Sequence, residues 1–259
     1  MEKISCVQRR RYILNKLEKD EQVIVSELSN LFSVSEVTIR KDLKHFEKKN
    51  MLIRSRGGAM KQSIINTDLS IYDRRKQNIR LKKAIGSAAA QMIKPGDTIL
   101  LDTGTTIMEL AKHLPKNIEL TIITNSVDIA FRLADYPNIK VIMPGGTLRK
   151  NSIALIGELA VESLRNYYCD KYFLSADAVN SEIGLMTTNI EEATIAKINI
   201  NNSNKVIALV DSTKFQRKGT VSIADLTKID VLITDSAIQH DVLQSVEKKG
   251  VEVIIADSS

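Results

Sequence analysis

Apolar residues recur at helical spacing through the first fifty positions of the chain. Between residues 7 and 19, Ile13, Leu14 and Leu17 fall on one helix face, with basic residues between them. Ser26 and Ser35 stand where helix N-caps are needed, before two further runs with the same period. The pattern predicts three helices, over residues 7–19, 26–32 and 36–49.

After the third predicted helix the pattern changes to alternation. Residues 51–56 alternate apolar and polar side chains, as a strand does, and Gly57-Gly58 supplies a turn. Two short helices, a tight turn at 33–35 and a basic third helix are typical of a helix-turn-helix, and the strand pair with its Gly-Gly turn would form a wing. Residues 1–59 are therefore predicted to form a winged helix-turn-helix domain. Residues 60–80 show no sustained period and are interpreted as a linker that ends in the start of a helix.

From residue 81 to 259 predicted strands and helices alternate. The strands are expected over residues 98–102, 120–124, 140–143, 172–175, 206–211, 231–234 and 252–256. The helices are expected over residues 81–92, 106–113, 127–134, 158–166, 190–199 and 237–248. Short, almost continuous apolar strands between helices indicate a mostly parallel sheet covered on both faces. The fold class is therefore α/β, with a small N-terminal domain and a larger C-terminal one.

The composition narrows the classes of protein. Only 4% of the residues are aromatic and Trp is absent, so an aliphatic core is expected. The apolar runs fall short of the roughly 18–20 residues needed to span a bilayer, and we expect no secretory signal. Cys6 and Cys169 form no spacing motif, and the three His residues are scattered, so neither a metal nor another cofactor is expected. These features favour a cytoplasmic protein.

Positive charge gathers at the N-terminal end. Residues 1–59 carry 13 Lys and Arg against 8 Asp and Glu, and residues 60–83 carry 7 against 2. Residues 84–259 carry 17 against 21, which leaves the whole chain at +6. This asymmetry indicates that one end meets a polyanion, although a well-solvated surface is also compatible with it.

The third predicted helix has the size and charge to enter the DNA major groove. Its first turns would meet base edges, and its cations would neutralise phosphates. Two arginines on the wing would contact the backbone or the minor groove. The candidate DNA-binding residues are Ser35, Glu36, Thr38, Arg40, Lys41, Lys44, Arg54 and Arg56. The alternative is a three-helix subdomain with a solvated basic face.

Three polar loops follow predicted strands of the larger domain. In open α/β sheets ligands bind outside the carboxyl ends of strands, so we expect the three loops to face one crevice. Gly and Thr beside unpaired N–H groups at a helix start suit a phosphate, although each loop could equally be a plain helix cap. The candidate residues in these loops are Asp102, Gly104, Thr105, Thr106, Thr124, Asn125, Ser126, Gly145, Gly146 and Arg149.

Two further charged positions are candidates for the same crevice. Lys214 follows a predicted strand and could pair with a ligand phosphate or carboxylate, whereas Asp102 and Glu192 could hold sugar hydroxyls. Ordinary surface roles remain open for all three. The loops lack the Gly-Lys-Thr/Ser sequence of a phosphate-binding loop, so nucleotide hydrolysis is not predicted.

Residues in both halves of the chain resemble those of a known protein family. The stretch Val34-Ser35-Glu36-Val37-Thr38-Ile39-Arg40-Lys41-Asp42-Leu43, with Arg54 and Gly57-Gly58-Ala59, closely resembles the DNA-binding module of the DeoR family of bacterial regulators. The C-terminal pieces that resemble the family are Asp102 to Thr106, Thr124-Asn125-Ser126, Gly145-Gly146, Gly157, Gly184 with Thr187, Glu192-Ala193 and Asp211 to Phe215. Departures are Arg56 in place of a His, Asn50 in place of a Gly, and Ala196-Lys197 in place of Lys-Arg.

The resemblance implies a fold, ligands and partners. The C-terminal domain should be similar to ribose-phosphate isomerases and glucosamine-phosphate deaminases. Family members mostly repress operons of sugar catabolism, respond to phosphorylated sugars, and act as homodimers or homotetramers on double-stranded DNA. A repressor is therefore the leading hypothesis. A sugar-phosphate isomerase or deaminase with a DNA-binding head, and a sequence-independent DNA-compacting protein, are the alternatives.

Overall fold

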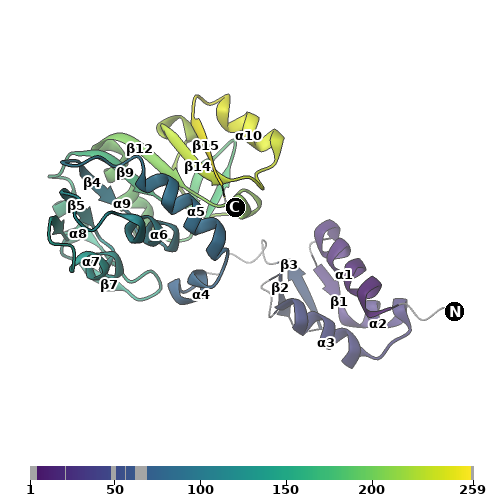
Figure 1. Ribbon diagram of the computed structural model, residues 1–259. Coiled ribbons are helices and arrows are strands. Elements are labelled where there is room, and N and C mark those ends of the chain that lie inside the picture. Colours follow the sequence, from purple (N-terminus) through teal and green to yellow (C-terminus); the bar gives the residue numbers. More distant parts are fainter. Residues whose placement is uncertain (1–4, 21, 48–50, 56, 62–68, 258–259) are drawn as a thin grey trace. The chain divides into compact units, whose positions relative to one another are not determined.

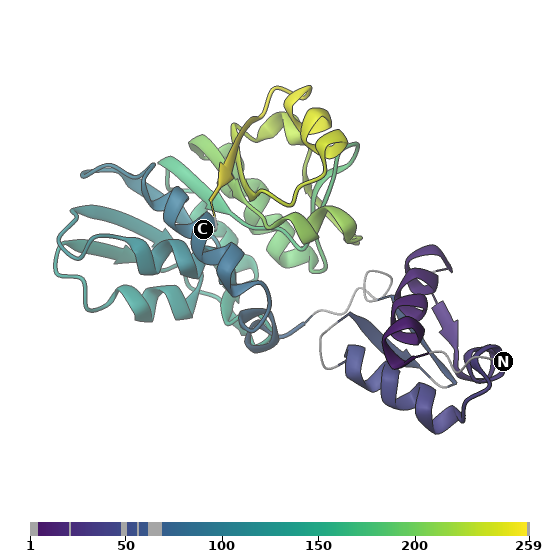
Figure 2. The same cartoon turned by 45° about the vertical axis from the view of Figure 1, so that its right-hand side comes forward.

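The computed structural model describes residues 5–20, 22–47, 51–55, 57–61 and 69–257. The chain divides into two compact units, Met1–Asn66 and Thr67–Ser259. Figure 1 labels the elements of both, and Figure 2 shows the same ribbon from a second direction. Each unit is described by itself below.

The first unit has three helices and a three-stranded sheet. Its elements are α1 (Cys6–Asp20), β1 (Gln22–Ile24), α2 (Val25–Phe32), α3 (Glu36–Glu47), β2 (Leu52–Ser55) and β3 (Gly58–Lys61). The strands pair antiparallel in the order β1-β3-β2. One aliphatic cluster holds the unit together, and its fully buried members include Ile13, Leu28, Ile39 and Leu43. This arrangement is a winged helix-turn-helix.

The turn and the wing each depend on one backbone feature. Ser33 ends α2 in the left-handed conformation, with φ 51° and ψ 43°, which turns the chain into α3. Gly58 begins β3 beside β1, where a Cβ atom would lie 2.2 Å from the carbonyl oxygen of Val23. Only glycine fits that approach, which accounts for the second glycine of the Gly57-Gly58 pair.

The predicted linker 60–80 is too long at both ends. Met60 and Lys61 belong to β3, because they pair with β1 and β2. Ile71–Arg75 form helix α4, and α5 begins at Ile79. The second strand of the predicted wing is β3, which pairs with β2 across the turn. β1, which adds a third strand to this sheet, was not predicted.

The second unit is built on a seven-stranded, all-parallel sheet. Its strands are β4 (Thr98–Leu101), β5 (Leu120–Thr124), β6 (Ile139–Ile142), β9 (Cys169–Leu174), β12 (Ser203–Leu209), β14 (Val231–Asp235) and β15 (Glu252–Ala256). Its helices are α4 (Ile71–Arg75), α5 (Ile79–Ala90), α6 (Thr105–His113), α7 (Val127–Leu133), α8 (Glu158–Leu164), α9 (Ile190–Asn201) and α10 (His240–Glu247). The strand order is β15-β14-β12-β9-β4-β5-β6. The α/β fold class is therefore confirmed.

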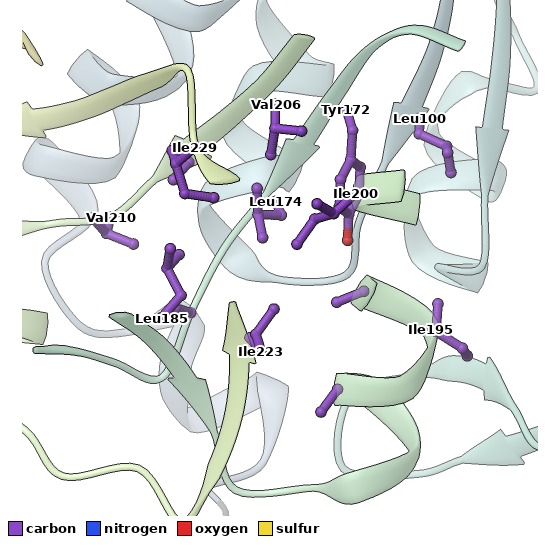
Figure 3. Close-up of a cluster of buried hydrophobic side chains, with 14 of the residues drawn as sticks. Leu100, Tyr172, Leu174, Leu185, Ile195, Ile200, Val206, Val210, Ile223 and Ile229 are labelled. Atoms are coloured by element: carbon purple, nitrogen blue, oxygen red, sulfur yellow. The ribbon is translucent and has the colours of Figure 1, made fainter. Parts of the chain in front are cut away.

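Both faces of this sheet are buried, as the continuous apolar strands require. Ile99 and Leu101 of β4 face α5, α6 and α7, whereas Leu100 faces the opposite cluster with α8 and α9. Figure 3 shows this opposite cluster, in which Tyr172 and Leu174 of β9 meet side chains from α9 and from a second, smaller sheet.

Several short strands lie outside the main sheet. The smaller sheet has the order β10-β11-β13, from Ala178–Asn180, Gly184–Thr187 and Val221–Ala224. A hairpin joins β7 (Thr147–Arg149) to β8 (Ala154–Ile156). None of these five strands was predicted from the sequence.

The strand order creates one switch point. From β4 the chain proceeds through β5 to β6 on one side, and then returns to place β9 on the other side of β4. The connections that leave β4 and β9 therefore diverge at their carboxyl ends. In open α/β sheets this divergence forms a crevice for a ligand. The residues that follow β4, β9 and β12 are thus expected to line any binding site.

Candidate functional site

The basic side chains of α3 stand on its open face. Ile39, Leu43 and Phe46 are buried on the other face, which fixes the orientation of the helix. The predicted DNA-binding residues Ser35, Glu36, Arg40, Lys41 and Lys44 are exposed, and Thr38 is half-buried. Arg54 on β2 is also exposed, whereas Arg56 lies outside the described residues. The structure thus presents a continuous polar and cationic surface along α3.

The start of α3 is capped by its own polar side chains. The hydroxyl of Ser35 lies 3.0 Å from that of Thr38 and accepts the backbone N–H of Thr38 at 3.3 Å. The guanidinium of Arg40 donates to Glu36 at 2.7 Å, with about half of each side chain exposed. An exposed pair one helical turn apart contributes little to stability. Arg40 can therefore exchange Glu36 for a phosphate or a base at small cost.

A buried carboxylate fixes α3 against α1. Asp42 accepts the Nε–H of Arg9 and of Arg10, each at 2.7 Å, and its side chain is 3% exposed. Burial acts to raise its pKa, but the two arginines outweigh burial and hold the pKa below the usual range. Asp42 is part of the motif read from the sequence, yet its anchoring role was not predicted, because its partners lie over thirty residues earlier.

Two adjoining cavities lie at the switch point of the large sheet. The empty space within them, counted together with the solvent at their open mouths, is about 390 and 350 Å³. Residues after β4, β9 and β12 line them, together with residues 74–82. The first cavity is lined by Arg74, Gln77, Asn78, Lys82, Gly104, Thr105, Thr106, Ser175, Ala176, Asp177, Asp211, Lys214 and Arg217. The second is lined by Arg74, Asp102, Thr103, Ser175, Ala176, Asp177, Thr187, Glu192, Ala196 and Ile223.

The first cavity is cationic. Burial and the nearby Arg217 lower the pKa of Lys214 to about 8, against the raising effect of Asp177 and Asp211. Burial likewise lowers the pKa of Lys82 to about 8. Both ammonium groups would gain from an added negative charge, because an anion offsets the cost of burial. The cavity therefore suits an anionic group.

A helix start opens onto the same cavity. Gly104 precedes α6 with φ 129°, and no side chain caps the N–H groups that follow it. A Cβ atom at this position would lie 2.5 Å from the hydroxyl of Ser175, so glycine is required by space as well as by backbone conformation. Thr105 and Thr106 are buried in the first turn. Free N–H groups at a helix start favour phosphate through hydrogen bonds and the helix dipole.

The second cavity is rich in carboxylates. Burial, together with the neighbouring Glu192 and Asp177, raises the pKa of Asp102 to about 7, against backbone hydrogen bonds from Thr103 and Ser175 that lower it. Burial also raises the pKa of Glu192, against the lowering effect of Ser152 and Arg149. Arg149 pairs with Glu192 at 3.1 Å. Carboxylates in such a wall accept hydrogen bonds from hydroxyl groups, which makes this end complementary to a polyol.

The structure brings together about half of the predicted effector residues. Asp102, Gly104, Thr105, Thr106, Glu192 and Lys214 line the two cavities, and Arg149 reaches them through Glu192.

The other predicted effector residues do not line either cavity. Thr124, Asn125 and Ser126 are almost fully buried, and their hydrogen bonds stay within their own loop, cap the start of α7 or reach Leu155 of β8. Gly145 and Gly146 are exposed in the loop before β7. The expectation that all three loops face one crevice therefore finds support for the first loop, and for the third loop only through Arg149.

Sequence reasoning missed several cavity residues. Arg74 fell within the predicted linker, and Lys82 fell within a predicted helix without a role. Asp177 and Arg217 were not singled out. The usable signal was the excess of positive charge over residues 60–83. Ala196 lines the second cavity, so the departure from the family pattern places a methyl group there in place of a cation.

The described residues contain neither a cluster of metal ligands nor a helix that could span a membrane. Within residues 5–257, apart from the undescribed positions, no group of three His, Cys, Asp or Glu could hold a metal ion. In the same part of the chain, no helix has the length and apolar character needed to cross a membrane.

The fold and the surface of α3 define a class of protein. A winged helix-turn-helix with an exposed basic helix, followed by an α/β domain with a charged cavity, is the organisation of a DNA-binding transcription regulator with a sensor domain. Two family models match the chain, the DeoR-like helix-turn-helix domain over residues 9–64 and the DeoR C terminal sensor domain over residues 77–236. The chain belongs to the DeoR family.

Individual relatives agree with this assignment. The uncharacterized HTH-type transcriptional regulator YulB of Bacillus subtilis is 38% identical over 246 residues, which cover 95% of this chain and 95% of that protein. The HTH-type transcriptional repressor GlcR of Bacillus subtilis is 32% identical and covers 95% and 94% respectively. Among solved structures, ribose 5-phosphate isomerase A from Methanocaldococcus jannaschii matches with a TM-score of 0.40 and 23% identity, over 54% of this chain and 55% of that one.

Proposed function

We propose that this regulator represses an operon of sugar catabolism, and that a phosphorylated sugar in the sensor domain changes its affinity for DNA. The observation that carries the proposal is the pair of adjoining cavities, cationic at one end and rich in carboxylates at the other. A phosphorylated sugar has the same division, with a dianion at one end and hydroxyl groups at the other. The relative GlcR is named a transcriptional repressor, which supports the direction of the regulation.

Each end of the ligand has its own partners in this proposal. The phosphate lies at the start of α6, where Gly104 and Thr105 offer N–H groups and Lys214 supplies charge. The sugar hydroxyls donate to Asp102 and Glu192 in the second cavity. The ligand must bind two states of the protein with different affinity, since otherwise it could not shift the equilibrium between them.

At the DNA end, α3 enters the major groove. Arg40 and Lys41 lie near base edges and phosphates, and Arg54 on β2 reaches the backbone or the minor groove. A homodimer or homotetramer would read repeated or palindromic half-sites, whose spacing follows from the symmetry of the protein. The regulator would act in the cytoplasm, where its DNA lies.

Two measurements test the proposal. A thermal-shift screen of sugar phosphates against the intact protein should raise Tm for one or more compounds. Any such compound should then alter the retention of DNA from upstream of the regulator's own operon. Asp102→Ala should keep DNA binding but blunt the response to the sugar phosphate. An unchanged response in this variant would remove Asp102 from the site.

An enzymatic role is the second candidate, because Asp102 has a pKa of about 7 in a cavity and could exchange protons with a substrate. We propose that the chain is not an enzyme, since the relatives YulB and GlcR are named as transcriptional regulators. A turnover assay with ribose 5-phosphate and amino-sugar phosphates separates the two functions.

A further inference from the structure

The first helix of the sensor unit carries a cavity residue. α4 follows the undescribed residues 62–68 and is the first helix of the unit that begins at Thr67. Arg74, in its last turn, lines both cavities. Its Nη1 donates to Asp177 Oδ1 at 3.2 Å, while its Nε is buried without a hydrogen-bond partner among the described residues. Arg74 therefore lines both cavities with one N–H donor, Nε, that no described residue accepts.

Asp177 can release Arg74 at low cost. Its other carboxylate oxygen, Oδ2, accepts the hydroxyl of Thr187 at 2.9 Å and both the N–H and the hydroxyl of Thr188. Burial acts to raise the pKa of Asp177, but Lys214 and Arg74 outweigh burial and lower it. If Arg74 turned to another anion, Asp177 would keep three donors and the charge of Lys214. A half-buried carboxylate with such support does not depend on a single partner.

The backbone of α4 is tied to the same cavity. Lys82 Nζ donates to the carbonyl oxygen of Arg74 at 2.7 Å, and Lys82 is itself a buried cavity residue. At its other end α4 is held by the N–H of buried Ile71, which donates to Asn151 at 2.7 Å. α4 has only five residues, and a helix this short depends on its tertiary contacts for stability. The position of α4 therefore depends on which groups Arg74 and Lys82 bind.

We propose that Arg74 couples occupancy of the cavity to α4, and so to the chain segment that leads from the DNA-binding unit. This inference rests on the proposed function of the cavity as an anion site. A phosphate dianion offers Arg74 a bidentate partner that is stronger than its single bond to Asp177. Arg74 then exchanges Asp177 for the ligand, and the last turn of α4 follows it. The residue acts as a positioning residue for α4 as well as a contact of the ligand.

The test uses the intact protein with inorganic phosphate as the probe. Binding is followed by Tm, and the state of α4 by amide hydrogen exchange over residues 71–78. Phosphate should raise Tm and change the exchange of this segment in the wild type. Arg74→Ala should keep a Tm rise, through Lys214 and the start of α6, but lose the change in exchange. Arg74→Lys should restore part of it, because the charge returns without the bidentate geometry.

A matched control and a ligand-free arm accompany the test. Lys76→Ala removes the same charge from an exposed position of the same segment and should behave as the wild type. Asp177→Asn should speed exchange over residues 71–78 without phosphate, because the bond from Arg74 is weakened. This arm does not depend on ligand binding, so it remains informative if Arg74→Ala is unstable.

The outcomes separate this inference from the proposed function. A phosphate-dependent change in exchange that persists in Arg74→Ala would overturn the coupling role and leave the anion site intact. Complete loss of the Tm rise in Arg74→Ala would also overturn the coupling role, since Arg74 would then be a binding residue alone. If phosphate left wild-type Tm unchanged, the anion site itself would be refuted, and the coupling with it.

Discussion

The basic face of α3 and the first sensor cavity use the same kinds of residue in opposite surroundings. Arg40 on α3 is about half exposed and holds a neighbour from its own helix, whereas Lys82 in the cavity is 5% exposed. Exposed cations are screened by salt and change partners easily. Buried cations are costly to keep charged, which lowers the pKa of Lys82 and Lys214 to about 8.

The contrast predicts which of the two binding sites depends on salt and which depends on pH. Binding at α3 should depend strongly on salt, because it releases counterions from DNA. Binding in the cavity should depend on pH in the mildly alkaline range, because its lysines titrate there. The following variants test this division from the largest expected effect to the smallest.

The largest effect is expected on the scaffold that supports α3. Asp42→Ala leaves Arg9 buried without its carboxylate, so the first unit should lose about 3 kcal/mol of unfolding free energy. Urea unfolding of the intact protein, followed by a probe in each unit, measures the loss. Glu36→Ala, an exposed acid of the same helix, is the control and should cost only a few tenths. Equal losses in the two variants would contradict the anchoring role of Asp42.

The next effect is on the cavity. Lys214→Met removes a buried ammonium group that should face the ligand phosphate, and should weaken sugar-phosphate binding by about a hundredfold. DNA affinity without ligand should not change. Calorimetric titration gives the affinity, and Lys218→Met, at an exposed neighbouring position, is the control. A Lys214→Met protein that bound as tightly as the control would place the phosphate elsewhere.

A comparable or smaller effect is expected from the reading surface. Arg40→Ala should weaken binding to the operator by about ten- to a hundredfold and reduce discrimination against scrambled DNA. Circular dichroism should stay the same, since the side chain is about half exposed. Fluorescence anisotropy with labelled duplexes measures both affinities, with Lys19→Ala as an exposed control outside α3. Retained discrimination would mean that other residues read the bases.

The smallest effect is the pH dependence of the cavity. A lysine is cationic below its pKa and neutral above it, and Lys82 and Lys214 both have a pKa of about 8. Sugar-phosphate affinity should therefore fall by about threefold between pH 7 and pH 8, as both lysines lose part of their charge. DNA affinity should stay level over the same interval. A sugar-phosphate affinity that rose with pH would show that the lysines do not contact the anion.

The sequence was a good guide to the main sheet and to the first unit. All seven strands of the sheet were expected, and the bounds of β5 and β15 agree with the structure, because continuous apolar runs between helices have few other interpretations. The strands of the smaller sheet have three or four residues among polar loops. Their pairing depends on tertiary contacts, so local pattern could not predict them.

The residues of the candidate site divide in the same way, into those that local pattern could predict and those that it could not. Asp102 and Gly104 could be named because they follow a recognisable strand directly. Arg74 and Arg217 meet them only after residues 70–82 and the loop after β12 fold over the switch point. Arg217 lies more than a hundred positions after Gly104, and such proximity is a property of topology that neither the spacing nor the residue types of one sequence can reveal.

The most direct measurement is the affinity of the intact protein for operator DNA and for a scrambled duplex, with and without a sugar phosphate found in the thermal-shift screen. The account predicts a clear preference for the operator, a shift in that affinity when the sugar phosphate is added, and loss of the shift in Lys214→Met. Equal affinity for both duplexes, or a shift that survives in Lys214→Met, would contradict it.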